Sequence, residues 1–194
     1  MNIFLEINKI VWPYLNNFVI ENWLEKYISF FADFPIFFLP IFLLWYRIFY
    51  THKNKNDEKR NDLMKIFITT VIAISINLII QNIFHLDRPE SIVTPILEHV
   101  PDASFPSDHA AVSFAFLFAI LLTNYKKSFW LFLPFVILMN FSRIAWWIHW
   151  FFDVIVWMII WLISALLILK IFKNNIYINN MNASIMKILK KINF

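Results

Sequence analysis

The chain has 194 residues, and none of them is glycine or cysteine. Without cysteine, the protein has no disulfide bonds and no thiolate ligands for a metal ion. Glycine normally makes up about 7% of a protein, so here every turn and every close helix contact is made by residues that carry a side chain. Charged residues are also scarce, at 15% of the chain, whereas 60% of the residues are hydrophobic. A soluble domain is far less apolar, so the sequence predicts a membrane protein.

Five apolar stretches of the sequence are close in length to a transmembrane helix. A hydrocarbon core of about 30 Å requires about 20 helical residues, and a helix satisfies its own backbone hydrogen bonds in lipid. The stretches lie near residues 28–50, 63–84, 110–124, 129–147 and 151–172. The third stretch is short, so we expect its helix to begin in the residues just before it. The predicted fold class is an all-α polytopic membrane bundle with about five transmembrane helices.

The two ends of the chain are less uniformly apolar than these stretches. Residues 1–26 are apolar in patches that charged residues and a proline interrupt, which predicts an N-terminal interfacial helix, with a sixth span as the alternative. They lack the cleavage pattern of a secretory signal, so we expect the mature chain to keep them. Residues 173–194 place lysines between apolar residues at near-helical spacing, which predicts a basic amphipathic cytoplasmic tail. We therefore expect a single membrane domain over residues 1–172.

The lysines and arginines gather on one side of the predicted bundle. Most of them lie in residues 51–62, 125–128 and 173–194. Since basic loops remain in the cytoplasm, the N-terminus and the loops at residues 84–109 and 147–151 are expected outside. Membrane topology and anionic headgroups thus account for the net charge of +4, and we do not expect a nucleic-acid partner.

Three polar clusters lie where the predicted spans reach this outer side. They are Asp87-Arg88-Pro89, Pro106-Ser107-Asp108-His109, and Ser142-Arg143 with His149 and Asp153. Ionised side chains beside apolar helices require a compensating partner or a function. A phosphate group is the natural partner for two arginines and two histidines, so the sequence predicts one phosphate site on the outer face.

The first two clusters also have simpler structural interpretations. The guanidinium of Arg88 can bind two phosphoryl oxygens, but it can equally contact lipid headgroups or pair with Asp87. Ser107 suits the N-cap of a helix, whose free N–H groups bind anions, and His109 can then donate a proton to the bound group. The alternative is a capped helix start followed by a surface histidine.

The interpretation of the third cluster as one site depends on the spacing of its residues in the sequence. His149 and Asp153 are four residues apart, so the carboxylate can bond one imidazole nitrogen and leave the other free to attack. Arg143 lies six residues before His149, and the two side chains reach one pocket only if the chain bends between them. The tryptophans nearby are expected to be membrane-interface residues.

Taken together, the clusters resemble the signature of the type 2 phosphatidic acid phosphatase family. That signature consists of an arginine-proline element, a Pro-Ser-x-His element and Ser-Arg-x(5)-His-x(3)-Asp, and this chain has the last two in full and in the family's order. The resemblance covers about residues 31–168. The Phe-Pro-Ser-Asp-His subtype and the short loop with Arg88 and Pro89 are similar to bacterial undecaprenyl pyrophosphate phosphatases.

The resemblance implies a role for each of these residues. His149 would be the nucleophile that takes the phosphoryl group, Asp153 would orient it, and His109 would protonate the leaving group. Three residues would hold the phosphoryl oxygens: Arg88, Ser107 and Arg143. The resemblance implies neither a metal nor a cofactor, and the other histidines and aspartates show no metal-binding spacing.

The chain departs from the family pattern at three positions. The lysine that the family often has seven residues before the arginine is Gln81 here, which can donate hydrogen bonds but is a weaker phosphate ligand. The usual glycine two residues before the nucleophile is Trp147, and the common proline two residues after it is Phe151. The last two substitutions mean that the backbone around His149 need not have the geometry that is usual in the family.

The resemblance thus implies an integral membrane lipid phosphatase. The predicted reaction is hydrolysis of undecaprenyl pyrophosphate to the monophosphate through a phosphohistidine, at the outer face of the bacterial inner membrane. This would link the protein to cell-wall biogenesis and bacitracin resistance. Phosphatidate, phosphatidylglycerophosphate and lipid A are alternative substrates. A non-catalytic or designed scaffold of the same fold is the alternative class, motivated by the missing glycines and by Trp147.

Overall fold

The structure is a computed structural model that describes residues 2–46, 57–84, 105–146, 148–173 and 176–191. The helices are α1 (Asn2–Glu21), α2 (Glu25–Asp33), the 3-10 helix η1 (Phe34–Phe37), α3 (Phe38–Trp45), α5 (Asp57–Ile83), α6 (Asp108–Leu121), α7 (Lys126–Ala145), α8 (Phe151–Ile171) and α9 (Ile176–Lys191). No strand occurs within the described ranges. The predicted all-α fold class is confirmed.

Within these ranges, four helical segments are long and apolar enough to cross a membrane. The first is Glu25–Trp45, which joins α2, η1 and α3, and the others are Glu58–Ile83, Lys126–Ala145 and Phe151–Ile171. The helix α6 is apolar as well but has only 14 residues. Together these segments form the polytopic bundle that the sequence predicts.

The helix α6 begins inside the Pro-Ser-Asp-His motif, as its short apolar stretch predicted. Ser107 is the N-cap residue, with extended backbone angles of φ −74° and ψ 120°. Its hydroxyl oxygen accepts a hydrogen bond from the backbone N–H of Ala110 at 3.4 Å. The carboxylate of Asp108 in the first turn favours the positive end of the helix dipole. The motif therefore starts the helix and carries its polar residues at the end of the bundle.

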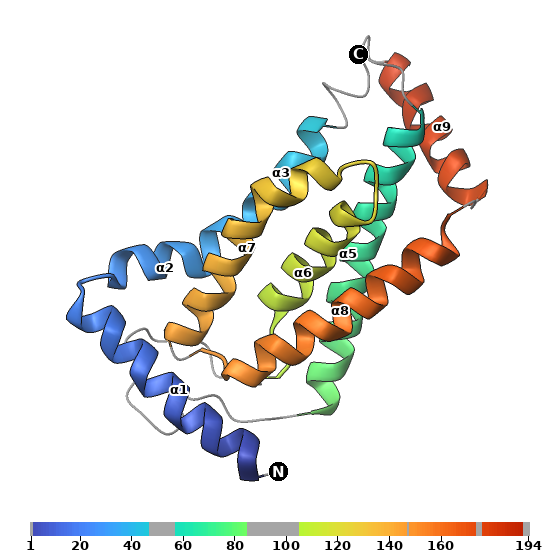
Figure 1. The fold of residues 1–194 in the computed structure, drawn as a ribbon. Coiled ribbons are helices and arrows are strands. Elements are labelled where there is room, and N and C mark those ends of the chain that lie inside the picture. The colour runs from blue at the N-terminus through green and yellow to red at the C-terminus, as the bar shows by residue number, and fades with distance from the viewer. Residues whose placement is uncertain (1, 47–56, 85–104, 147, 174–175, 192–194) are drawn as a thin grey trace.

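The helix α6 lies inside the bundle, packed against α5, α7 and α8 (Figure 1). Most of its side chains are buried. Ala111, Ala115 and Ala119 are fully buried and recur every four residues, so they lie along one face of the helix. Small side chains let neighbouring helices approach closely. Alanines therefore take the place that glycines often have in membrane bundles.

The turn between α1 and α2 also does without glycine. Trp23 has a positive φ of 57° there, a conformation that glycine adopts most easily. The backbone N–H groups of Trp23 and Leu24 donate to the carbonyls of Ile20 and Val19 at 3.2 and 3.0 Å. These two hydrogen bonds form a Schellman motif that ends α1. A tryptophan thus occupies a position at which helices usually have glycine.

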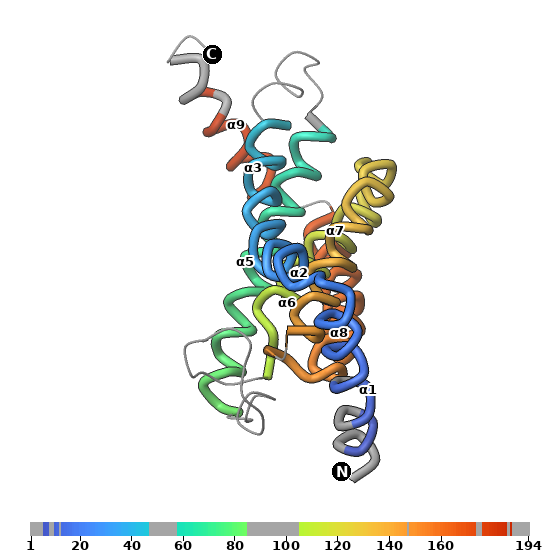
Figure 2. The backbone as a smooth tube through the Cα atoms, turned by 90° about the vertical axis from the view of Figure 1, so that its left-hand side faces the viewer, coloured from blue at the N-terminus to red at the C-terminus, as the bar shows by residue number. Residues whose placement is uncertain are grey.

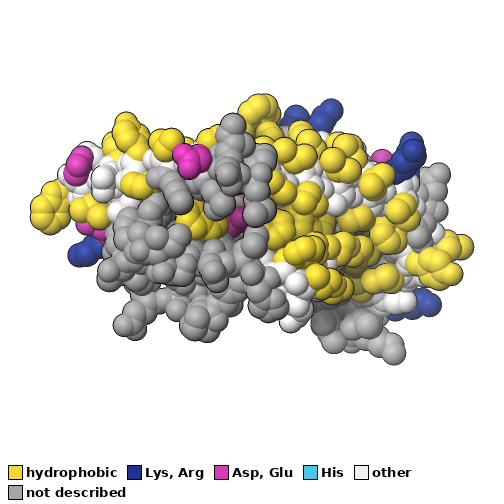
Figure 3. All heavy atoms as spheres, turned by 90° about the horizontal axis from the view of Figure 1, so that it is seen from below, with side chains coloured by type: hydrophobic (Ala, Val, Ile, Leu, Met, Phe, Trp, Pro, Cys, Tyr) yellow, Lys and Arg dark blue, Asp and Glu magenta, His cyan; other side chains and the backbone are white. Residues whose placement is uncertain are grey.

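Large apolar side chains cover the outside of the bundle. Ile41, Ile79, Leu131 and Leu167, from four different helices, are each more than half exposed. Figure 3 shows hydrophobic side chains over much of the described surface, with few charged side chains among them. Water solvates such a surface poorly, whereas lipid solvates it well. The exposed apolar surface supports a multi-pass membrane protein.

The helices α1 and α9 lie at opposite ends of the molecule (Figure 2). The helix α1 packs against α7 and α8, and Asn16 Nδ2 donates to the carbonyl oxygen of Ala145 at 3.1 Å. The helix α9 packs against α5, where Asn61 Nδ2 donates to Asn179 Oδ1 at 2.7 Å. The interfacial position of α1, and the division into a membrane domain and a cytoplasmic tail, stay predictions.

Candidate active site

One end of the bundle brings together the start of α6, the end of α7 and the start of α8 (Figure 1). The start of α6 carries the Pro-Ser-Asp-His motif, the end of α7 carries Arg143, and the connection to α8 carries His149. Two of the three sequence clusters therefore lie at the same end of the molecule. Figure 1 also places α1 at this end.

Arg143 and His149 are neighbours because the chain reverses between α7 and α8. The carbonyl oxygen of Arg143 accepts the backbone N–H groups of Ile148 and His149 at 3.2 and 3.3 Å. This compact turn brings Arg143 Nη2 to 3.4 Å from His149 Nε2, with both side chains buried. The bend that their spacing in the sequence requires is therefore present.

Asp33, at the end of α2, links Arg143 to His109. Its Oδ1 atom lies 2.6 Å from Arg143 Nη1 and 3.4 Å from His109 Nε2. The Asp33 side chain is 64% exposed, whereas those of Arg143 and His109 are 5% and 18% exposed. One exposed carboxylate therefore contacts two largely buried basic groups.

Sequence reasoning missed Asp33, although the chain carries a signal for it. Asp33 is the only carboxylate in the first apolar stretch, near residues 28–50. An ionised side chain inside such a stretch generally marks a functional site or a buried partner. Here the partner is Arg143, which comes from another transmembrane helix.

Two amide side chains on α5 hold the Pro-Ser-Asp-His motif. Gln81 Nε2 donates to the Pro106 carbonyl oxygen at 2.9 Å and to Asp108 Oδ1 at 3.1 Å. Asn77 Nδ2, one turn earlier, donates to the same two oxygens. Gln81, predicted as a weak phosphate ligand, thus contacts the motif itself, and its contact with phosphate stays a prediction. Asn77 was missed, although the four-residue spacing of the two amides places them on one helix face.

Asp153 lies in the first turn of α8, where it is buried. Its Oδ2 atom accepts the backbone N–H of Trp150 at 3.2 Å. This hydrogen bond caps the start of α8 and fixes the carboxylate about one turn after His149. The predicted hydrogen bond from the His149 imidazole to Asp153 stays a prediction.

The whole first cluster, Asp87-Arg88-Pro89, lies outside the described residues, and so does Trp147, which precedes His149 by two positions. Ser107 is described and is fully buried at the N-terminus of α6. Where the structure describes the chain, no three side chains of histidine, aspartate or glutamate are grouped as ligands of a metal ion would be.

The arrangement suits an anion with several oxygen atoms. A guanidinium, an imidazole and a helix N-terminus each favour negative charge, and the Asp33 carboxylate lies between the first two. The buried imidazole of His149 contacts the same guanidinium. An anion bound to Arg143 would therefore lie within reach of a nucleophilic nitrogen. This geometry can serve phosphoryl transfer to histidine.

Comparison with known proteins gives consistent matches. The model of the PAP2 superfamily matches residues 62–177. The Bacitracin transport permease protein BcrC of Bacillus licheniformis is 30% identical over 171 residues, which are 85% of this chain and 80% of that protein. The Undecaprenyl-diphosphatase BcrC of Bacillus subtilis (strain 168) is 34% identical over 91 residues, which are 46% and 47% of the two chains. The Putative undecaprenyl-diphosphatase YbjG of Escherichia coli (strain K12) is 31% identical over 99 residues, half of each chain. No solved structure matches the chain significantly.

Proposed function

The chain belongs to the PAP2 superfamily, and we propose that it hydrolyses undecaprenyl pyrophosphate to undecaprenyl phosphate and inorganic phosphate. The family match and the relatives make it a membrane lipid phosphatase. The names of two relatives support the polyprenyl substrate. The observation that carries the catalytic proposal is the series of contacts from His149 through Arg143 and Asp33 to His109.

His149 Nε2 is the proposed nucleophile. Arginine has only hydrogen-bond donors, so its contact with Nε2 suits the tautomer with a lone pair on Nε2 and a proton on Nδ1. The lone pair then lies next to the guanidinium that would hold the phosphoryl oxygens. Asp153, fixed in the first turn of α8, is the proposed acceptor for the proton on Nδ1. This orientation would keep Nε2 ready to attack.

The proposed reaction has two steps. In the first, His149 Nε2 bonds to the terminal phosphorus while the bond from phosphorus to the bridging oxygen breaks, and His109 donates a proton to the departing lipid monophosphate. In the second, water gives a proton to His109 and attacks the phosphohistidine, which releases inorganic phosphate. Two easier displacements replace one difficult displacement. Three residues are proposed to stabilise the charge on the phosphoryl oxygens: Arg88, Ser107 and Arg143.

Asp33 is proposed to be the partner of Arg143 before substrate binds. Buried charges without a partner are unfavourable, and the Asp33 carboxylate compensates the buried guanidinium of Arg143. A phosphoryl group would take over this contact when it binds. The exposure of the Asp33 side chain supports this exchange, because few protein atoms surround the carboxylate and it can turn away from Arg143.

The charge distribution supports a site on the outer face of the bacterial cytoplasmic membrane. Several lysines lie at the end of the bundle opposite His149, where α5 and α7 begin and α8 ends: Lys59, Lys65, Lys126, Lys127, Lys170 and Lys173. Basic segments remain on the cytoplasmic side. The candidate site would then face outside.

Phosphate release by the purified full chain tests the proposal. In detergent, the protein should release phosphate from undecaprenyl pyrophosphate faster than from phosphatidate. His149→Ala should lower the rate about 10³-fold or more, because it removes the nucleophile. Trp130→Ala, on the exposed surface of α7, is the matched control and should keep the wild-type rate. With a substrate labelled in the terminal phosphate, acid-labile label should remain on the unchanged protein and not on His149→Ala.

Two outcomes would contradict the proposal in different ways. Equal rates for the unchanged protein and His149→Ala would remove His149 from the mechanism. A folded protein that neither releases phosphate from any lipid nor binds vanadate would be a non-catalytic member of the superfamily.

A further inference from the structure

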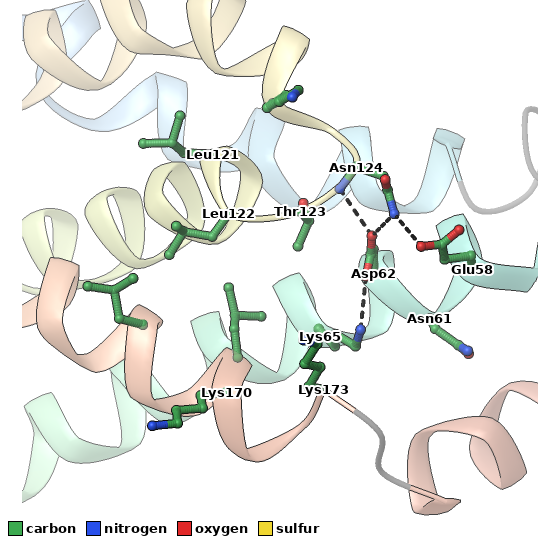
Figure 4. A pocket seen from close by; sticks show the side chains of 13 residues that line it. Glu58, Asn61, Asp62, Lys65, Leu121, Leu122, Thr123, Asn124, Lys170 and Lys173 are labelled. Carbon is green, nitrogen blue, oxygen red and sulfur yellow. Dashed lines mark hydrogen bonds and ion pairs between the residues drawn. The ribbon is translucent and has the colours of Figure 1, made fainter.

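A cavity of about 810 Å³ lies at the end of the bundle opposite the candidate active site (Figure 4). Its walls come from the first turns of α5, the connection between α6 and α7, and the last turns of α8. Cavities that bind ligands commonly have volumes of about 300–1,000 Å³. No residue of the candidate active site lines this cavity.

The polar side of the cavity is built on a fixed carboxylate. Asp62 is buried and accepts hydrogen bonds from Lys65 Nζ at 3.0 Å and from the backbone and side-chain nitrogens of Asn124 at 3.1 and 2.7 Å. Asn124 Nδ2 also donates to Glu58 at 3.1 Å. Figure 4 shows this network joining α5 to the connection after α6. The network fixes one wall and satisfies the Asp62 carboxylate.

The remaining charge of the cavity is positive. Four lysines line it, against two carboxylates. Lys65 pairs with Asp62, whereas Lys126, Lys170 and Lys173 form no ion pair with the described part of the chain. Three ammonium groups around one cavity favour an anionic ligand.

The opposite side of the cavity is apolar. Leu121 at the end of α6 and Leu122 just after it line this side, together with Leu166 and Leu169 of α8. Leu121, Leu122 and Leu166 are between 38% and 48% exposed, on a bundle whose outer surface is apolar. A ligand that contacts both the lysines and the leucines must therefore have a charged head and a hydrophobic tail.

We propose that this cavity binds an anionic phospholipid, with its phosphate beside Lys170, Lys173 and Lys126 and an acyl chain along the leucines. The cavity lies where helices begin and end, which is the depth of lipid headgroups around a membrane bundle. Basic pockets between helix ends are known to bind anionic headgroups. A soluble anion would use the lysines but would leave the apolar wall without a partner.

Lipid retention by the purified full chain tests this proposal. Phosphatidylglycerol and phosphatidylcholine with the same acyl chains are titrated into the protein in neutral detergent, and bound lipid is counted by native mass spectrometry. Phosphatidylglycerol should bind more tightly. The double variant K170Q/K173Q should weaken its binding about 25-fold, at about fivefold for each lysine. K127Q removes a neighbouring exposed lysine that does not line the cavity, and it should bind like the unchanged protein.

Three results would overturn the proposal. Equal binding of the two lipids would exclude recognition of the headgroup charge. An equal loss in K127Q and K170Q/K173Q would show general attraction to a basic surface. Displacement of the lipid by glycerol phosphate at the same concentration would show that the ligand is a soluble anion. If K170Q/K173Q does not keep the circular dichroism spectrum of the unchanged protein, K126Q replaces it, with an expected weakening of about fivefold.

Discussion

At the scale of single residues, Asp33 determines how the charges of the site are satisfied. One carboxylate oxygen contacts both the Arg143 guanidinium and the His109 imidazole. The guanidinium in turn contacts His149. The group that would bind phosphate, the proposed nucleophile and the proposed acid are therefore joined through a residue from a different helix. A substitution of Asp33 should therefore change the affinity of the site for any anion that binds to Arg143.

We expect Asp33→Asn to bind vanadate about tenfold more tightly than the unchanged protein. Asparagine keeps the shape of the side chain but removes its charge, and a neutral hydrogen bond is weaker than a charge-assisted one by about 0.5–2 kcal/mol. Arg143 is then more easily released to the incoming anion. Titration calorimetry measures the affinity, and Glu21→Gln, exposed on α1, is the control. Weaker vanadate binding by Asp33→Asn would show instead that the carboxylate positions Arg143 for the anion.

The residues of the site differ in how well the sequence predicts them. Ser107 could be predicted as a helix cap because capping depends on the residues that directly follow it. The approach of Arg143 to His149 could be predicted only on the condition of a bend between them. Asp33 and Asn77 could not be assigned, because their partners are set by the packing of separate helices. The spacing of residues along the chain does not contain that information.

At the scale of secondary-structure elements, α6 determines how closely the helices of the bundle pack. It has 14 residues, fewer than any of the four candidate membrane spans in the described ranges, but it contacts α5, α7 and α8. The fully buried alanines on its face let those helices come close. Since α6 also carries Ser107 and His109 at its start, its packing sets where these two side chains lie.

We therefore expect Ala115→Leu to lower the free energy of unfolding by about 1–3 kcal/mol, because a larger side chain overfills a packed core. Thermal unfolding in detergent measures the change. Leu167→Ala, at a side chain that is 57% exposed on α8, is the control and should change the stability by less than about 0.5 kcal/mol. Equal unfolding midpoints for Ala115→Leu and the unchanged protein would contradict the close packing of α6.

Several of the helices in the described ranges begin before the apolar stretches from which they were predicted. The second apolar stretch was expected near residue 63, but α5 begins at Asp57. Its first turns carry charged residues, which hydropathy does not count as part of a span although they belong to the same helix. The first stretch was expected near residue 28, but its helical segment begins at Glu25 and includes the 3-10 helix η1, which begins at Phe34 with Pro35. Hydropathy reports the lipid-facing length and not the full helix.

At the scale of the whole molecule, the two ends of the bundle have different chemistry. One end carries the candidate active site, and the other carries lysines and the second cavity. The direction in which the protein sits in the membrane therefore decides which compartment its substrate comes from. Because the chain has no cysteine, each single-cysteine variant has one thiol, and labelling reports its side of the membrane directly.

We expect Asn22→Cys to react with a membrane-impermeant maleimide in intact spheroplasts, and Lys127→Cys to react only after the membrane is opened. Asn22 precedes the first candidate span, and Lys127 lies in the first turn of α7, where the basic residues gather. Both side chains are exposed. Mass spectrometry of the purified variants measures the labelled fraction, and labelling of both in opened membranes is the control. The reverse pattern would place the candidate site in the cytoplasm.

If phosphate binds to Arg143 as proposed, each phosphate that enters the site must displace the Asp33 carboxylate. The carboxylate is held beside Arg143 by α2, so it competes with every dissolved anion for that guanidinium. Released inorganic phosphate would have to displace it without any contribution from a hydrocarbon tail, whereas a polyprenyl-linked phosphate gains binding energy from that tail. A built-in competitor of this kind would lower the affinity for both by the same factor, so inorganic phosphate would bind too weakly to inhibit the enzyme while a lipid phosphate would still bind through its tail.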